Sequence, residues 1–198
     1  MLPFKTVLAL VVLATSAHTA TADEICVEGY LMDIFCINQG FLFQDKGDVK
    51  TLFPLSHPDV HMVECLVGLP FCRASGYELL LDPIDSENDW CRGFNFEATG
   101  NEMVIAYAKA NGNWQRETNP DGSACGDFCQ GDGNTTKGMR ASIRGTILAS
   151  STNSTTAPPT LQVTSVSAAG SCTASEDAMV HASLTIFNGN CTSGASRL

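Results

Sequence analysis

Nine cysteines, all lying beyond an apolar N-terminal segment, constrain this chain more than any other feature of its sequence. The segment, "MLPFKTVLALVVLATSAHTATA", contains one basic residue, Lys5, an apolar run from Val7 to Ala14, and then small residues up to Ala22. This order is typical of a cleaved secretory signal peptide, whereas a membrane-spanning helix needs about 20 consecutive apolar residues. We therefore expect residues 1–22 to be removed and the rest of the chain to be secreted.

Disulfides are the expected state of most of these cysteines, because secreted proteins fold in an oxidising compartment. Nine is an odd number, so one cysteine is left to be a free thiol, to bind a metal or to link two chains. The predicted disulfide cysteines are Cys36, Cys65, Cys72, Cys125, Cys129, Cys172 and Cys191. We expect Cys172 to pair with Cys191, because the strand-like run "MVHASLTIF" between them can fold back and bring them together.

The negative charge of the chain disfavours one class of partner, nucleic acid. Without residues 1–22 the chain loses one of its 11 basic residues and keeps all 21 acidic ones, which gives a net charge of −11. A nucleic-acid partner is not expected, because binding to phosphates relies on clustered Lys and Arg. No later segment is apolar enough to span a membrane, so we expect an extracellular ligand, a matrix partner or a second chain joined through the odd cysteine. Predicted glycosylation sites are Asn134, Asn153 and Asn190.

The pattern along the chain favours a mainly β domain. In "MRASIRGTIL" apolar and polar residues alternate, which is typical of a half-buried strand. Further strands are predicted at 25–32, 76–83, 91–98, 102–110, 160–168 and 179–187. Several short strands separated by turn residues indicate a single barrel-like (OB-like) or sandwich domain over residues 23–170. Residues 171–198 are predicted to form a disulfide-closed C-terminal extension.

One short helix is predicted from Pro58 to Leu66 in the stretch "SHPDVHMVECLVGLPFC". On that helix His57, His61 and Cys65, four residues apart, would share one face, with Asp33 or Cys36 able to approach from the first strand. Two imidazoles, a thiolate and a carboxylate suit a tetrahedral Zn or Cu ion. Asp33, His57, His61 and Cys65 are therefore a candidate metal site.

The alternative for the same stretch is a disulfide staple formed among Cys36, Cys65 and Cys72. The helix must turn its apolar residues to the core and its acidic residues, Asp59 and Glu64, to water. That division predicts that His57 and His61 are exposed near the mouth of a loop, whereas Cys65 faces inward. The sequence favours the staple over the metal site.

The order of several short motifs carries a resemblance. Gly29-Tyr30, Asp33 and Cys36 precede "HPDVHMVECLVGLPFCRASGYELL", which is followed by Arg144-Gly145-Thr146 and "PPTLQVTSV". This order resembles an uncharacterised secreted, cysteine-containing domain of diatoms and other marine algae, and shorter exported bacterial domains with OB-like barrels. The resemblance covers roughly Val27 to Val166. It implies a fold and assigns no activity.

The sequence therefore predicts a secreted binding or structural protein that holds a metal or a ligand near His57–Cys72. One alternative is an extracellular enzyme that uses the same Asp and His residues for acid–base chemistry. Another is a glycosylated cell-surface or wall protein whose odd cysteine links chains. The serine turn of many hydrolases, Gly-X-Ser-X-Gly, does not occur, and no catalytic residues are assigned.

Overall fold

The computed structural model describes residues 24–42, 52–83, 89–114, 136–148, 157–173 and 176. The predicted signal peptide and the strand predicted at 179–187 lie outside these ranges. So do the predicted glycosylation sites and three of the cysteines, namely Asn134, Asn153, Asn190, Cys125, Cys129 and Cys191.

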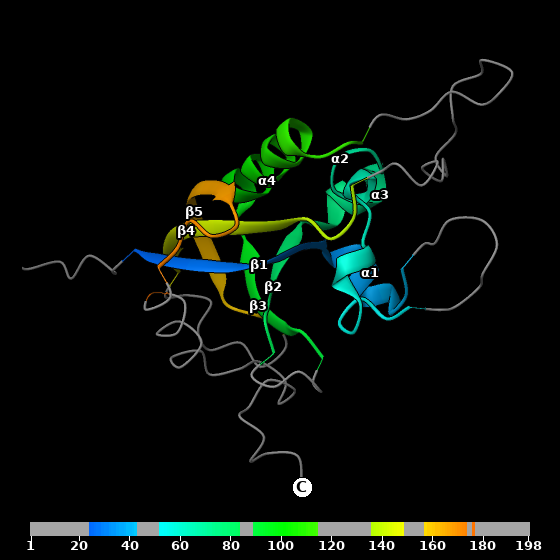
Figure 1. The fold of residues 1–198 in the computed structure, drawn as a ribbon, viewed down its shortest axis with the longest axis horizontal. Coiled ribbons are helices and arrows are strands. Elements are labelled where there is room, and N and C mark those ends of the chain that lie inside the picture. The colour runs from blue at the N-terminus through cyan, green and yellow to red at the C-terminus, as the bar shows by residue number, and fades with distance from the viewer. Residues whose placement is uncertain are drawn as a thin grey trace, which may run out of the picture.

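One mixed sheet of five strands forms the centre of the described structure (Figure 1). The strands are β1 (Ile25–Asp33), β2 (Tyr77–Leu81), β3 (Cys91–Phe96), β4 (Arg140–Ile147) and β5 (Thr160–Ala168). Their order is β1-β2-β3-β5-β4, and β1 also pairs with β4, so the sheet closes on itself. Neighbours are antiparallel except β3 and β5, which run parallel over a short contact. The prediction of a mainly β domain is confirmed.

The main core lies inside the closed sheet. Alternate residues of β1 point inward there, and Val27 and Leu31 are 0% and 1% exposed. They pack against apolar side chains of the other strands, among them Leu79, Leu81, Phe94, Ile143 and Leu161. These fully buried side chains supply most of the hydrophobic stabilisation, at about 1.5–3 kcal/mol for each large apolar side chain.

Helices pack against the sheet. They are α1 (Ile34–Gln39), the 3-10 helix η1 (Pro58–Val60), α2 (Val63–Val67), α3 (Pro70–Ser75) and α4 (Ala98–Asn111). Figure 1 shows α1, α2 and α3 together at the end of the sheet where β1 finishes, and α4 apart from α1 along the sheet. α4 contacts β5 and α2. The end of β1 is therefore enclosed by three short helices.

The strand predicted at 102–110 is wrong, because these residues belong to α4. The carboxylate of Glu97 caps this helix and accepts hydrogen bonds from the N–H groups of Thr99 and Gly100. The buried residues Gly100, Val104 and Ala108 follow at spacings of four, which is the period of a helix face. The run "MVIAYA" is apolar enough to resemble a strand, but its cap and its four-residue period decide for a helix.

The single helix predicted from Pro58 to Leu66 is also wrong, because the chain divides into η1 and α2. His61 and Met62 between them have extended backbone angles, with ψ of 123° and 136°. This extended pair binds the segment before β4: Gly138 N–H donates to His61 O (2.9 Å), and Met62 forms a β-bridge with Lys137. Backbone pairing with a distant segment thus replaces the hydrogen bonds of a continuous helix.

A disulfide joins Cys26 in β1 to Cys172 after β5. The predicted pairing of Cys172 with Cys191 is therefore wrong, and with it the extension closed by that bridge. The cause lies in Glu28, whose carboxylate oxygen Oε1 accepts hydrogen bonds from the backbone N–H groups of Gly170 (2.8 Å) and Cys172 (3.1 Å). This carboxylate holds the turn against β1 and presents Cys172 to Cys26.

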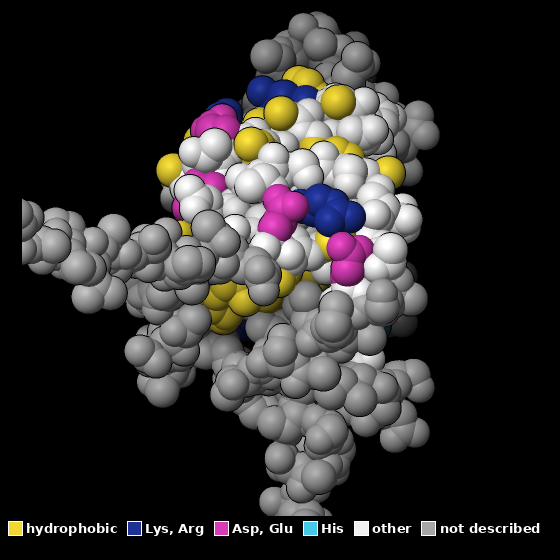
Figure 2. Space-filling view, turned by 90° about the vertical axis from the view of Figure 1, so that its left-hand side faces the viewer, with side chains coloured by type: hydrophobic (Ala, Val, Ile, Leu, Met, Phe, Trp, Pro, Cys, Tyr) yellow, Lys and Arg dark blue, Asp and Glu magenta, His cyan; other side chains and the backbone are white. Residues whose placement is uncertain are grey.

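One face of the molecule exposes charged side chains of both signs. Figure 2 shows the side of the molecule on which β4 and β5 lie, where basic side chains lie beside acidic ones near the centre. In the described part of the chain, no helix has both the length and the apolar character needed to cross a membrane.

Replacing Glu28 by Gln should flatten the acid dependence of stability. Burial acts to raise the pKa of Glu28, but hydrogen bonds from Ser142, Cys172 and Gly170 outweigh it and lower the pKa. A carboxyl group with a lowered pKa stabilises the fold above its unfolded-state pKa, and this stabilisation is lost as the pH falls through its folded-state pKa. Urea unfolding between neutral and acid pH should show a smaller loss of stability for Glu28→Gln than for the wild type.

The control is Glu102→Gln, which removes the same charge from the exposed face of α4. Its acid dependence should match that of the wild type. Equal pH profiles for Glu28→Gln and the wild type would show that this carboxylate does not anchor the turn through its charge.

Candidate metal centre

Asp33, the last residue of β1, organises the candidate centre. Its carboxylate oxygen Oδ1 accepts a hydrogen bond from Cys36 N–H (2.9 Å) and so caps the N-terminus of α1. Asp is favoured at this position because its short side chain can accept from the first N–H groups of a helix, which have no partner within it. Gly40, with φ of 74°, ends α1 in a left-handed conformation that glycine adopts at little cost. A six-residue helix thus holds Cys36 beside the end of β1.

Two backbone contacts tie α1 to α3. Phe35 N–H donates to Ser75 Oγ (2.9 Å), and Ile34 N–H donates to Gly76 O (3.0 Å). The rings of Phe35 and Phe71 lie 4.7 Å apart and cover this junction. These contacts bring Cys72, the buried residue of α3, to the side of α1.

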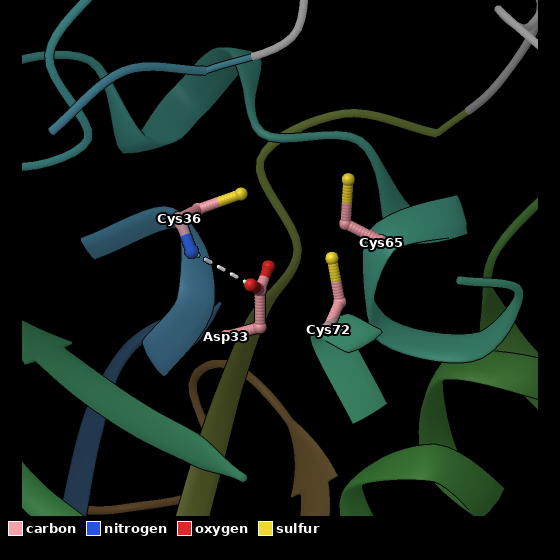
Figure 3. Close-up of side chains that lie close together, drawn as sticks. All are labelled: Asp33, Cys36, Cys65 and Cys72. Carbon is pink, nitrogen blue, oxygen red and sulfur yellow. Dashed lines mark hydrogen bonds between the residues drawn. The ribbon is translucent and has the colours of Figure 1, made fainter. Parts of the chain in front are cut away.

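α2 is held from two directions. Val63 N–H donates to Thr136 O (2.9 Å), which fixes its start, and the Tyr77 hydroxyl donates to Leu66 O (2.5 Å), which fixes its end. Val63 and Leu66 are fully buried in the main core. With this face of α2 against the core, Cys65 points toward Cys36 and Cys72, as Figure 3 shows. The predicted inward orientation of Cys65 is confirmed.

Four donor atoms meet between these elements (Figure 3). A carboxylate oxygen of Asp33 and the sulfur atoms of Cys36, Cys65 and Cys72 all lie within 4.8 Å of one another. Each of the four residues is at most 2% exposed. The three cysteines are free thiols, whereas Cys26, Cys91 and Cys172 are disulfide-bonded. The predicted staple among Cys36, Cys65 and Cys72 is therefore not formed in this structure.

His61 lies beside the four donors. Its Nε2 atom is 2.7 Å from Asp33 Oδ2, and its side chain is 1% exposed. Its other ring nitrogen, Nδ1, has no hydrogen-bond partner. The prediction that His61 is exposed is wrong, because the extended backbone at this residue turns the ring inward to the carboxylate.

The other predicted residues behave differently. His57 is exposed, as expected, and is not among the clustered donors. Asp59 is exposed, but Glu64 is only 4% exposed, which corrects the expectation that it faces water. Of the predicted metal set, the structure thus brings Asp33, His61 and Cys65 together and leaves His57 outside.

Proton affinities at the site differ strongly among the three thiols. Hydrogen bonds from Cys36 and then Cys72 lower the pKa of Cys65 well below its usual value. The hydrogen bond to Cys65 raises the pKa of Cys36. For Cys72 the contact with Cys36 acts to lower the pKa, but the contact with Cys65 and burial outweigh it and raise the pKa. Of the three thiols, Cys65 is therefore the one that ionises most readily.

His61 supplies the opposite charge. Burial acts to lower the pKa of His61, but the hydrogen bond to Asp33 and the contact with Cys65 raise it to about 10. The ring is thus an imidazolium at neutral pH, placed between a carboxylate and a thiolate. Opposite charges at short range compensate for the loss of water around each group.

The sequence contains a helix-capping pattern that predicts part of this arrangement. The spacing of the histidines and cysteines by itself does not. Asp33 stands three residues before Cys36, and Gly40 follows the apolar residues of α1, which is the pattern of a capped short helix. Read in this way, the pattern places Cys36 beside Asp33 rather than in a loop. The role of Cys72 could not be found from spacing, because its position depends on the contacts between α1 and α3.

No protein-family model, no curated protein and no solved structure matches this chain. The resemblance to an algal secreted domain stays a prediction.

His61 and His57 form a matched pair for mutation. His61→Ala leaves the Asp33 carboxylate buried without its charged partner, so we expect a loss of about 3–5 kcal/mol in the free energy of unfolding. His57→Ala removes an exposed ring and should change this free energy by no more than about 0.5 kcal/mol. Urea denaturation of the two variants checks the difference. Equal effects of the two substitutions would contradict the contact between His61 and Asp33.

Proposed function

We propose that this protein is a secreted metal-binding domain that holds one thiophilic ion, Zn(II) or Cu(I), between Asp33, Cys36, Cys65 and Cys72. The ion ties α1, α2 and α3 to the end of β1. In this proposal the metal has a structural role in an extracellular binding module.

The observation that carries the proposal is the convergence of three buried free thiols on one buried carboxylate, with all four donor atoms within 4.8 Å of one another. Cys65 and Cys72 pack with Leu69 against Phe35 and Phe71, and Cys36 packs with Met32, Leu42 and Leu80, so apolar side chains surround the thiols. A bound cation would neutralise thiolates and the carboxylate at once, in surroundings where unpaired charge is costly. The arrangement is therefore better suited to a cation than to an apolar core.

The donor types indicate the class of ion. Thiolates select Zn(II) and Cu(I) over Mg(II) and Ca(II), which prefer oxygen ligands. Three sulfurs and one carboxylate oxygen fill the four positions of a tetrahedral Zn(II) site, and the three sulfurs alone suffice for Cu(I). His61 supports the ligand Asp33 from behind, as outer partners of metal ligands commonly do.

Burial favours a structural role for the ion over catalysis. A catalytic zinc site keeps one position open to water or substrate, whereas a structural site is closed by protein ligands. Here the donors are at most 2% exposed, and His61 is 2% exposed. The Asp33–His61 pair thus supports metal binding better than acid–base chemistry on an external substrate.

The strand order supports the finer fold proposal, an OB-like barrel. OB folds are five-stranded Greek-key barrels that are partly open. The order β1-β2-β3-β5-β4, the short parallel contact of β3 with β5, and the position of helix α4 between β3 and β4 all agree with this fold. The metal site would then lie in the connection between the first and second strands of the barrel.

Metal analysis of the secreted protein tests the proposal. Protein purified without chelators should contain about one Zn or Cu ion per chain, as expected for a single site with four donors. The variants Cys36→Ser and Cys72→Ser should each lose the ion, because each removes one of the three sulfurs. Inductively coupled plasma mass spectrometry of the wild type and both variants measures the metal content.

The matched control is the double variant Cys26→Ser/Cys172→Ser, which removes two cysteines from the other end of β1. It should keep its metal even if its stability falls by about 2–5 kcal/mol. Wild-type protein that neither contains metal nor takes up added Zn(II) or Cu(I) in its reduced form would refute the proposal.

A further inference from the structure

We propose that the Cys36, Cys65 and Cys72 site is a redox switch, in which hydrogen peroxide converts two of its thiols to a disulfide and thereby prevents metal binding. This inference rests on the proposed metal-binding function and adds its regulation. It treats the metal site and the disulfide staple as two alternative states of the same residues.

The geometry brings the three thiols near one another without joining them. Their sulfur atoms lie within 4.8 Å of one another, and a disulfide requires about 2.05 Å. The cysteines belong to three separate helices of five or six residues, α1, α2 and α3. A small shift of one short helix, without rearrangement of the sheet, can bring two of the sulfurs together.

The number of thiols determines how many metal donors remain after oxidation. Two of the three cysteines can form a disulfide, and the third is then left without a partner in the site. The oxidised site keeps one thiol and the Asp33 carboxylate, so it loses two of its three soft donors. With one thiolate and one carboxylate left, the oxidised site has too few donors for a Zn(II) or Cu(I) site and cannot hold the ion.

Burial determines the class of oxidant. Cys36 and Cys72 are 0% exposed and Cys65 is 2% exposed, so a bulky disulfide reagent cannot approach their sulfurs in the folded state. Hydrogen peroxide has only two heavy atoms, and it can enter during small openings of the site. A small peroxide is therefore the oxidant that this geometry admits.

The reaction balances with one molecule of peroxide. A thiol sulfur attacks one peroxide oxygen, the O–O bond breaks, and the sulfur becomes a sulfenic acid while the leaving hydroxide takes the proton of the thiol to form water. A second thiol sulfur then attacks the sulfenic sulfur, the S–S bond forms and the S–O bond breaks. The leaving hydroxide takes the second thiol proton, so two sulfurs lose two electrons and one peroxide becomes two waters.

A bound metal would slow the first step, because each sulfur lone pair that attacks peroxide is then shared with the ion. Metal occupancy and disulfide formation are thus mutually exclusive. The disulfide between Cys26 and Cys172 belongs to the other end of β1 and takes no part in the switch.

Alkylation and peptide mapping test the switch. Reduced, metal-free protein with the Cys26–Cys172 bridge intact is treated with one equivalent of hydrogen peroxide, and free thiols are then alkylated. The count of alkylated cysteines among Cys36, Cys65 and Cys72 should fall from three to one, with the other two linked to each other. Uptake of Zn(II) should be lost in the same sample and should return after mild reduction.

A second measurement uses metal-loaded protein, so that the result does not depend on the fold of the metal-free form. Peroxide added to this protein should release Zn(II) to a coloured chelator in step with disulfide formation, and more slowly than it oxidises the metal-free protein.

The outcomes separate the two proposals. Metal binding by the reduced protein with all three cysteines alkylated after peroxide would overturn the switch and leave the metal site standing. Zn(II) uptake that is unchanged in protein with the disulfide would overturn the switch as well. Reduced protein that binds no metal, yet forms the disulfide, would refute the proposed function.

Discussion

The carboxylate of Asp33 is the group on which the arrangement at the end of β1 depends. One oxygen accepts the Cys36 N–H and starts α1, and the other contacts Nε2 of His61 at 2.7 Å. A buried carboxylate is costly unless it is paired and hydrogen-bonded, and both conditions are met here. The same side chain therefore sets the direction of the chain after β1 and fixes the segment before α2.

β1 is held by a carboxylate near each end. Near its start, Glu28 binds the backbone of the turn that carries Cys172, and the disulfide with Cys26 completes the attachment. At its finish, Asp33 binds the helix that carries Cys36. Between them β1 pairs with both β2 and β4, which places it at the seam where the sheet closes. The two cysteine clusters are thus separated by the length of one strand and differ in redox state.

Much of the sheet could be predicted from the sequence, because the alternation of apolar and polar residues along a strand indicates which of its side chains are buried. β4 and β5 follow this pattern, and their predicted ranges agree with the structure to within about two residues. α4 was missed because Val104 and Ile105 are strand-forming residues, while the Glu97 cap that marks a helix start is not among the usual capping residues. The error at His61 has another origin, since its extended backbone is set by pairing with Gly138 and Lys137, far away in the sequence.

Part of the candidate site could be predicted from the sequence for a similar reason. Cys65 was expected to face inward, because the apolar residues of its helix needed the core, and Asp33 was expected to approach from β1. The meeting of Cys36 with Cys72 depends on the contacts of Phe35 with Ser75 and Phe71, which no local pattern encodes.

The four donors all come from the stretch between Asp33 and Cys72, whereas the Cys26–Cys172 bridge spans a sequence separation of 146 residues. A chain made from its N-terminus presents the whole donor set before β3, β4 and β5 have been synthesised, and long before Cys172 exists to meet Cys26. Loops closed over few residues also form sooner than those closed over many. The order of synthesis therefore allows Cys36, Cys65 and Cys72 to come together first. Cys26 cannot pair with Cys172 until most of the chain has been made.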